Sequence, residues 1–400
     1  MKIAELEHPV TDRLRVLRIT VGLDPTFGGP SVSVVIQCLA TQAAGIAHTL
    51  AYPFHPDMSE DNESARLRLS AAGVVIRRFP ITRLAGHHSR RWAISGSLSR
   101  WLLTAIRGHD IVHVDGAWGA GQLCAVYVSK WANRPCVLSP HESLTEYDIV
   151  TSSAVPPWAK RVIRRRYMHR LALIVFSSCL EERDSMIPGA AARTVVLHHP
   201  VTDGGAAEAR AESERESTLR VGFLGRLHPK KNVDLLLRAL ARIPDAELVI
   251  AGDGPQKHRQ YLDAVVEQYR LKSRVRWLGF VSGAGREAFL DSVDVLAMPS
   301  AYECFGMAAA EAMARGVPTM VSTNCGIAEI VERNGCGVVV DPSLESWVEA
   351  ITEFRNGANR AALSEASVET AKLQLSSEAF GKAMHSEYLA LASGRTAVDV

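Results

Sequence analysis

Two glutamates, Glu303 and Glu311, are the side chains of this sequence that first suggest chemistry. They enclose the stretch CFGMAAA, in which Gly306 stands between an apolar run and an alanine-rich helical pattern. The free amides at such a helix start can bind an anion. A carboxylate among alanines has room to accept hydrogen bonds from the adjacent hydroxyls of a ribose. The plainer interpretation of Glu311 is a good helix former on a solvated face.

A second candidate is the loop GRLHPKKN, residues 225–232, which directly follows the apolar run LRVGFL. Arg226 and Lys231 bracket this loop, and Asn232 is expected to cap the helical pattern VDLLLRALARI. Two cations beside the amides of a helix start favour a site for phosphate or pyrophosphate. Most arginines and lysines are solvated surface residues, however, and that interpretation stays open for the loop taken alone.

Two glycine-rich turns also follow apolar runs, AGDGP at residues 251–255 and FGGPS at residues 27–31. Their glycines, Gly29 among them, let the backbone approach a ligand closely, and Ser31 is expected to cap the next helix. An ordinary Asp-Gly turn explains AGDGP equally well. FGGPS does not match GxGxxG, and no acid follows it at the expected spacing, so a nicotinamide dinucleotide site is poorly supported.

The composition of the 400-residue chain indicates a globular protein, with 47% hydrophobic and 22% charged residues. Its formal net charge of +2 gives no reason to expect nucleic acid as a partner. No apolar run approaches the ~18 residues of a membrane span, and no apolar core of a secretory signal is visible near the start. The seven cysteines are scattered without CxxC pairs, which is typical of reduced thiols. We therefore expect a cytoplasmic protein.

Short apolar runs alternate with helical patterns along the chain, which predicts parallel sheets covered on both faces. Residues 202–217 are small, polar and charged, which suits an interdomain linker. We predict an α/β protein with doubly wound domains at 1–203 and 218–376, a linker at 204–217 and a helical segment at 377–400. The site is expected in the cleft between the domains, beyond the carboxyl ends of strands. The predicted strands are 14–20, 47–53, 73–80, 110–116, 135–140, 173–178, 194–200, 219–225, 246–252, 275–280, 294–300, 317–322 and 336–340.

In combination these motifs resemble glycosyltransferase family 4, the retaining transferases with two facing Rossmann-like domains (the GT-B fold). The resemblance is carried by GRLHPKKN, AGDGP, ECFGMAAAEAMARGVPTMVSTNCGIAEIV and NGCGVVVDP, over about residues 219–342. The N-terminal half is similar to the family more loosely, through GGPS, DIVHVDG and SPHES. The resemblance implies transfer of a sugar from a nucleotide sugar to a hydroxyl acceptor. It also implies a C-terminal helix that crosses back to the N-terminal domain.

The resemblance assigns a role to each candidate of the donor site. Glu311 would hold the ribose of the donor, and Glu303 would bind hydroxyls of the transferred sugar. The diphosphate would be bound by Arg226, Lys231, Gly29 and the amides around Phe305 and Gly306. The two acids would then contact the two ends of one nucleotide sugar, with the pyrophosphate between them.

Two motifs of the N-terminal half depart from the family pattern. The chain has HVDG at 113–116 where the family usually reads His-x-His-Gly, and SPHE at 139–142 in place of Ser-Pro-His-Gly. The second histidine of the first motif usually lies near the reacting carbon, so Asp115 either takes that role or marks altered chemistry. His141 is the other candidate for a catalytic helper. His113 is expected to face the opposite side of the strand and to be a core histidine.

No Asp-x-Asp pattern occurs, so the sequence does not support a divalent metal, and no other cofactor is expected. Fixed cations and helix amides can stabilise a departing nucleoside diphosphate instead. The resemblance implies retention by front-face attack, and a UDP-sugar is expected over a GDP-sugar. A nucleotide-sugar epimerase of the same fold and a nucleotide-sugar-binding protein without turnover are the alternatives.

The expected acceptor is a glycan or a lipid-linked saccharide of cell-surface polysaccharide synthesis. Two basic, aromatic stretches of the N-terminal half bear on it. Residues 87–107 contain Trp92 and Trp101, and residues 160–170 contain six lysines or arginines. Such stretches suit peripheral contact with anionic lipid at the inner membrane surface, although a solvated helix face explains them equally well.

Overall fold

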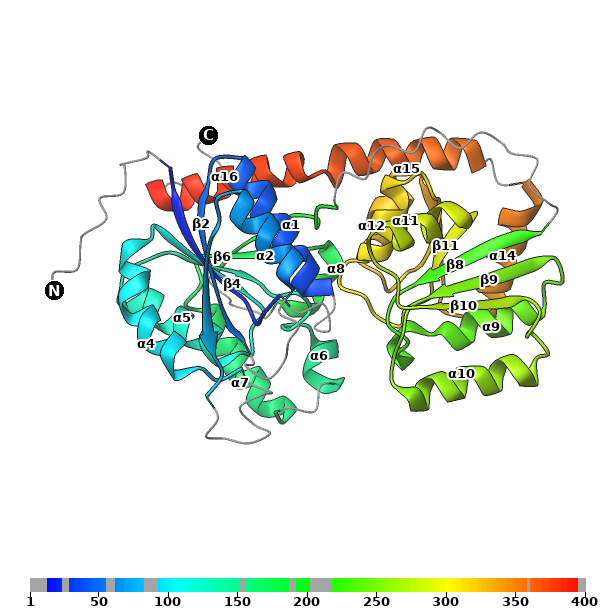
Figure 1. Ribbon diagram of the computed structural model, residues 1–400, viewed down its shortest axis with the longest axis horizontal. Helices are drawn as coiled ribbons and strands as arrows, with labels where there is room; N and C mark the ends of the chain where they lie inside the picture. Colours follow the sequence, from blue (N-terminus) through cyan, green and yellow to red (C-terminus); the bar gives the residue numbers. More distant parts are fainter. Residues whose placement is uncertain are drawn as a thin grey trace.

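The protein is described by a computed structural model with two α/β domains side by side along its longest axis (Figure 1). Each domain is built on one parallel sheet, so the predicted doubly wound architecture is confirmed. The predicted linker lies outside the described residues. Among the described residues, no helix has the length and apolar character needed to cross a membrane. The described ranges are 13–23, 29–54, 62–82, 93–151, 155–186, 192–201, 218–357 and 360–394.

The N-terminal sheet has seven strands in the order β3-β2-β1-β4-β5-β6-β7. The strand order reverses direction at β1 and β4, which is the switch point where doubly wound sheets bind ligands. Its strands are β1 (Arg15–Ile19), β2 (Ala47–Phe54), β3 (Val75–Pro80), β4 (Ile111–Asp115), β5 (Cys136–Ser139), β6 (Leu173–Phe176) and β7 (Arg193–Val196). Its helices are α1 (Gly29–Ala43), α2 (Glu63–Ala71), α4 (Gly96–Ala105), η3 (Ile106–Gly108), α5 (Ala120–Trp131), α6 (Glu146–Thr151), α7 (Pro157–Met168) and α8 (Cys179–Ser185).

The C-terminal sheet has six strands in the order β10-β9-β8-β11-β12-β13. Its switch point lies between β8 and β11, the strands that precede the GRLHPKKN loop and the Glu303 loop. Its strands are β8 (Leu219–Leu224), β9 (Ala246–Ala251), β10 (Val275–Gly279), β11 (Val295–Met298), β12 (Thr319–Ser322) and β13 (Gly337–Val340). Its helices are η4 (Pro229–Lys231), α9 (Val233–Ala241), α10 (Gln256–Gln268), α11 (Gly283–Ser292), α12 (Met307–Ala314), α13 (Ala328–Asn334), α14 (Leu344–Gly357) and α15 (Arg360–Gln374).

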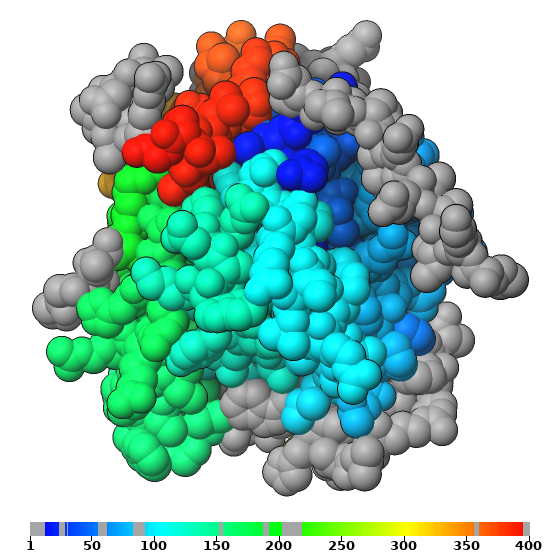
Figure 2. All heavy atoms as spheres, turned by 90° about the vertical axis from the view of Figure 1, so that its left-hand side faces the viewer, coloured from blue at the N-terminus to red at the C-terminus, as the bar shows by residue number. Residues whose placement is uncertain are grey.

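The last helix, α16 (Ser377–Ser393), crosses back and packs on the N-terminal domain, as predicted. Figure 1 shows α15 and α16 running along one edge of both domains, and Figure 2 shows α16 against the first described residues of the N-terminal domain. Alternate strand residues serve opposite cores. Leu17 and Val112 pack with α4 and α5, whereas Val16 and Ile111 pack with Phe380 and other side chains of α16.

His113 lies on the α16 side of β4, where it is fully buried. Its Nδ1 lies 2.5 Å from the hydroxyl of Tyr388 and its Nε2 lies 2.8 Å from that of Ser139. Burial lowers the pKa of His113 well below its usual value, so the ring is neutral. The prediction of a core histidine is confirmed. The expectation that it faces away from Asp115 is wrong, because residues two positions apart in a strand share a face.

Two predicted helix caps differ from the structure. Asn232 precedes α9, but it adopts a left-handed conformation with φ 50° and its side chain does not cap the helix. Its side-chain amide donates instead to the carbonyl of Pro299 at 3.1 Å, which ties the GRLHPKKN loop to the end of β11. Ser31 lies inside the first turn of α1 and does not precede the helix.

Candidate active site

Asp115 ends β4, at the carboxyl edge of the N-terminal sheet, and is almost fully buried. The guanidinium of Arg18, on the neighbouring strand β1, donates to both carboxylate oxygens at 2.7 Å. His141, just beyond β5, contacts Oδ1 through Nε2 at 2.9 Å. Burial alone would raise the pKa of Asp115, but the charge and hydrogen bonds of Arg18 and the bond from His141 hold it well below its usual range. Asp115 is therefore a fixed anion and not a free base.

A second set of contacts joins His141 to the other domain. The ring of His141 stacks on that of His199, with the centroids 5.2 Å apart. His199 in turn meets the edge of Phe305, from the loop before α12, at 5.3 Å. Phe305 is fully buried in this contact. The network around Asp115 therefore reaches the predicted donor loop of the C-terminal domain.

Glu142 and Lys230 form an ion pair across the two domains. Glu142 follows His141, and both have left-handed backbones, with φ of 76° and 49°. Non-glycine residues seldom adopt this conformation, and it is concentrated at functional sites. The ammonium of Lys230 also lies over the rings of Tyr147 and Tyr302, at 5.2 and 5.6 Å from their centroids. The loop that carries the phosphate motif is thus held against the N-terminal domain.

Lys231 and Glu303, two of the predicted donor-site residues, are in direct contact as an ion pair. Both are partly buried, with side-chain exposures of 19% and 17%. Burial raises the pKa of Glu303, and the positive charges of Lys231 and Lys230, with a smaller contribution from Arg226, lower it to below its usual value. Arg226 itself is exposed at the carboxyl end of β8. Three cations, Lys230, Lys231 and Arg226, thus lie around the carboxylate of Glu303 at the mouth of this loop.

Gly306 directly precedes α12 as its N-cap residue, with φ 123°, a conformation that residues with a side chain rarely adopt. An added Cβ would lie 2.9 Å from Cγ2 of Ile327, so both backbone and space require glycine. The amides of Phe305 and Gly306 have no hydrogen-bond partner among the described residues. They follow Glu303, the partner of Lys231, in the sequence. Free amides at a helix start suit an anion.

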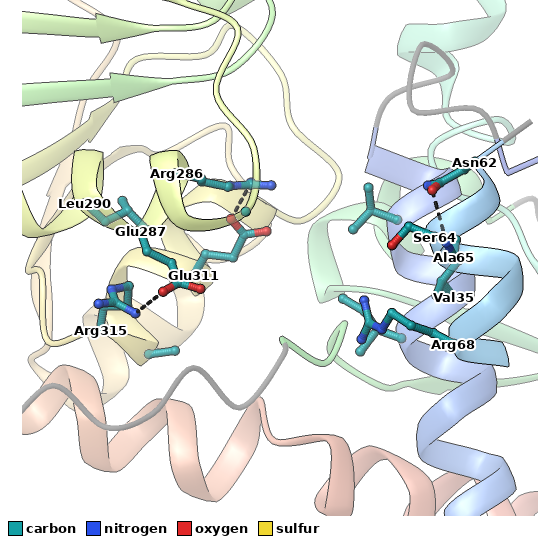
Figure 3. A pocket seen from close by; sticks show the side chains of 14 residues that line it. Val35, Asn62, Ser64, Ala65, Arg68, Arg286, Glu287, Leu290, Glu311 and Arg315 are labelled. Carbon is teal, nitrogen blue, oxygen red and sulfur yellow. Dashed lines mark hydrogen bonds and ion pairs between the residues drawn. The ribbon is translucent and has the colours of Figure 1, made fainter. Parts of the chain in front are cut away.

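Glu311 lies on α12 beside a pocket of about 280 Å³ between the two domains. Figure 3 shows α11 and α12 on one side of the pocket and α1 and α2 on the other. Glu311 pairs with Arg286 of α11. Burial raises the pKa of Glu311 to about 7, although Arg286 opposes the shift. Glu311 is therefore the carboxylate of the site that titrates near neutral pH.

The predicted residues fall into three groups in space. Asp115 and His141 touch, Lys231 and Glu303 touch, and Glu311 stands apart in the interdomain pocket. Gly29 is exposed at the first position of α1, and in the part of the chain that the structure describes no atom outside its own helix backbone lies within 4 Å of where a Cβ would be. Among the described residues, no group of three or more His, Cys, Asp or Glu side chains is arranged to hold a metal.

Sequence reasoning missed several residues of this site. They are Arg18, Gln37, His199, Glu142 and Lys230. A signal existed for some of them: an arginine inside the apolar run LRVLRIT, and a glutamate where the family usually has glycine in SPHE. A buried arginine demands an anionic partner, which pointed toward Asp115.

Two facing parallel α/β domains, with cations and free helix amides at the switch point of the second, define a two-domain nucleotide-binding protein of the GT-B type. Family models match both domains: "Glycosyl transferase 4-like domain" over residues 28–200 and "Glycosyl transferases group 1" over residues 206–370. The chain belongs to the group 1 glycosyltransferases.

Similar proteins agree with this family. An uncharacterized glycosyltransferase of Methanocaldococcus jannaschii is 41% identical over 123 residues, which are 30% of this chain and 31% of that protein. The 2-deoxystreptamine glucosyltransferase of Streptomyces kanamyceticus is 28% identical over 345 residues, 78% of this chain and 83% of that one. The crystal structure of Anabaena HepE with UDP and glucose has a TM-score of 0.72 at 17% identity, covering 94% of this chain and all of the other. That likeness shows the same fold.

Proposed function

We propose that the protein is a retaining glycosyltransferase that moves a sugar from a nucleoside-diphosphate sugar to a hydroxyl acceptor. One observation carries the proposal: Lys231 pairs with Glu303, and the free amides of Phe305 and Gly306 follow Glu303 directly at the start of α12. Glu311 lies five residues further along α12, about 7 Å along the helix axis. One nucleotide sugar can span these positions, with its diphosphate at the helix start, its ribose at Glu311 and its sugar at Glu303.

The reaction follows from these positions. The bond between the anomeric carbon and the diphosphate oxygen breaks, and its electron pair leaves with the nucleoside diphosphate. The acceptor oxygen bonds to the same face of that carbon, and its proton passes to the departing phosphate. Arg226, Lys231 and the helix amides stabilise the charge that develops on the diphosphate, so no metal is required. His141 and Glu303 orient hydroxyls of the substrates from opposite domains.

The donor is a UDP-sugar in this proposal, and the acceptor is a glycan or lipid-linked saccharide of cell-surface polysaccharide synthesis. The complex of Anabaena HepE with UDP supports the choice of base. The seven unpaired cysteines suit a cytoplasmic location, where thiols stay reduced. An epimerase of this fold would need no acceptor site. We take the network at His141 as part of an acceptor site, because it lies on the N-terminal domain and not on the domain that carries the donor loop.

We also propose peripheral contact of α7 with anionic lipid. Trp158 and Val162, one turn apart on this helix, are 69% and 49% exposed, and Arg165 and Arg166 are exposed beside them. The free charge is smaller than the sequence suggests, because Lys160 is buried and pairs with an acid of the protein. Trp158→Ser should reduce sedimentation with phosphatidylglycerol vesicles, and equal binding by the variant would contradict the contact.

The decisive experiment incubates the protein with a panel of labelled nucleotide sugars and candidate acceptors. Transfer with the donor's anomeric configuration kept in the product is expected. Inversion in the product would refute the mechanism, and a changed sugar still attached to nucleotide would establish an epimerase. Slow donor hydrolysis without acceptor would exclude a protein that binds and does not turn over.

A further inference from the structure

We propose that Arg18 and Gln37 are positioning residues for His141, acting through Asp115 and His199. The two hold the His141 ring in one orientation and one tautomer, with Nδ1 left to accept a hydrogen bond from a substrate hydroxyl. The inference rests on the proposed transferase function, because it gives His141 its substrate.

Five buried side chains close a ring of contacts. Arg18 donates to Asp115 through Nε and Nη2 at 2.7 Å, and Nη2 also donates to Oε1 of Gln37 at 2.5 Å. The amide nitrogen of Gln37 donates to Nδ1 of His199 at 2.8 Å. His199 stacks on His141, and His141 returns to Asp115 at 2.9 Å. The members come from β1, α1 and β4 and from the loops after β5 and β7, so tertiary packing alone assembles the ring.

The ring fixes the proton of His141. An ionised carboxylate only accepts hydrogen bonds, so the nitrogen of His141 that contacts Asp115 must carry the proton. That nitrogen is Nε2, which leaves Nδ1 as the acceptor. The two hydrogen bonds from Arg18 keep Asp115 ionised and fix the plane of its carboxylate. Arg18 therefore selects the tautomer of His141 without contacting it.

Gln37 fixes the orientation of the His141 ring by holding His199, on which that ring stacks. Because Oε1 of Gln37 accepts from a guanidinium, its amide group must face His199, whose Nδ1 is then the acceptor. His199 is thereby held in its stack with His141 and in its T-shaped contact with Phe305. His141 is clamped at the domain boundary, next to the predicted donor loop.

A purely structural role does not account for this arrangement. A buried ion pair is often no more stabilising than apolar side chains of the same volume. The His141 backbone, with φ 49°, adds strain that persists only where its surroundings enforce it. A charged ring that enforces a strained histidine suits positioning.

The test reads the tautomer directly, by nuclear magnetic resonance of protein labelled with nitrogen-15 in histidine. The signal of His141 is assigned by its loss in His141→Gln. We expect a proton on Nε2 and none on Nδ1 in the parent. In Arg18→Gln/Asp115→Asn, which leaves no unpaired buried charge, the proton should no longer be fixed on Nε2. Gln37→Met keeps the Arg18–Asp115 pair, so the proton should stay on Nε2 while the less restrained ring broadens the signal by exchange.

Turnover supplies the second readout. Both variants should lower kcat roughly 10- to 100-fold, the usual cost of losing a group that orients a functional histidine, with donor affinity nearly unchanged. Thr41→Val is the matched control: Thr41 lies one turn further along α1, is equally buried and bonds His48 at 2.6 Å, outside the ring. It should keep both the His141 signal and kcat.

The outcomes separate this inference from the proposed function. A proton on Nδ1 in the parent, or the parent signature retained in both ring variants, overturns the positioning role. So does an equal fall of kcat in Thr41→Val, which would mark a general effect of a damaged core. Absence of any transfer activity would refute the function while leaving the tautomer result intact.

Discussion

Donor binding should depend on pH through Glu311, the acid whose pKa burial raises to about 7. The ribose hydroxyls donate to an ionised carboxylate, so binding requires the deprotonated form. With a pKa of 7, the apparent dissociation constant is about 11 times that of the fully ionised protein at pH 6 and about 1.1 times at pH 8. Donor affinity should therefore rise about 10-fold between these pH values, or about 1.4 kcal/mol.

Two variants sharpen this prediction. Glu311→Gln keeps the shape and removes the titration, so its binding should be weaker and flat from pH 6 to pH 8. Arg286→Leu removes the positive charge that opposes the rise, so the midpoint of the pH dependence should move upward. Calorimetry with an intact nucleotide sugar is the assay. A flat profile for the parent, or the same slope in Glu311→Gln, would refute the assignment of Glu311 to the ribose.

Four further predictions follow from the contacts. Arg226→Ala or Lys231→Ala should each weaken donor binding by roughly 1.5–3 kcal/mol in calorimetry, and unchanged affinity would remove that residue from the site. Chelator should leave turnover largely intact, whereas complete loss reversed by magnesium or manganese would contradict metal-independence. Asp115→Asn should lower kcat roughly 10- to 100-fold with little change in donor affinity, and near-parent turnover would leave Asp115 structural. Lys230→Met should lower the free energy of unfolding by about 1–3 kcal/mol, because its partly buried partner Glu142 stays unpaired. Lys382→Met, at an exposed ion pair, should cost under about 0.5 kcal/mol. Equal losses would contradict a role of Lys230 in joining the two domains.

The fold was predictable because its signals are local. Most strands of both sheets are short runs rich in β-branched and apolar residues, and each of the thirteen predicted runs overlaps a strand. The donor candidates were also predictable, because Arg226 and Lys231 share one loop and Glu303 and Glu311 share one strand-to-helix connection. Spacing within one loop or helix reports directly on proximity.

The network around Asp115 was less predictable because its contacts are long-range. Asp115 is 97 residues from Arg18, and Gln37 is 162 residues from His199. Glu142 and Lys230 are 88 residues apart and lie on different domains. No local pattern encodes these pairings, since they arise where strands far apart in the chain become neighbours. The sequence did mark Asp115 as unusual, but not the cation that changes its chemistry.

Asp115 and Glu311 show why the partner matters more than the residue type. Both are carboxylates beside an arginine, Asp115 fully and Glu311 largely buried, yet the pKa of Asp115 falls well below its usual range and that of Glu311 rises to about 7. Arg18 is fully buried and binds both oxygens of Asp115, and His141 adds a third bond. Arg286 is 32% exposed, so solvent screens its charge and burial prevails at Glu311. One acid is thereby a permanent anion that can orient a histidine, and the other can change charge when a ligand arrives.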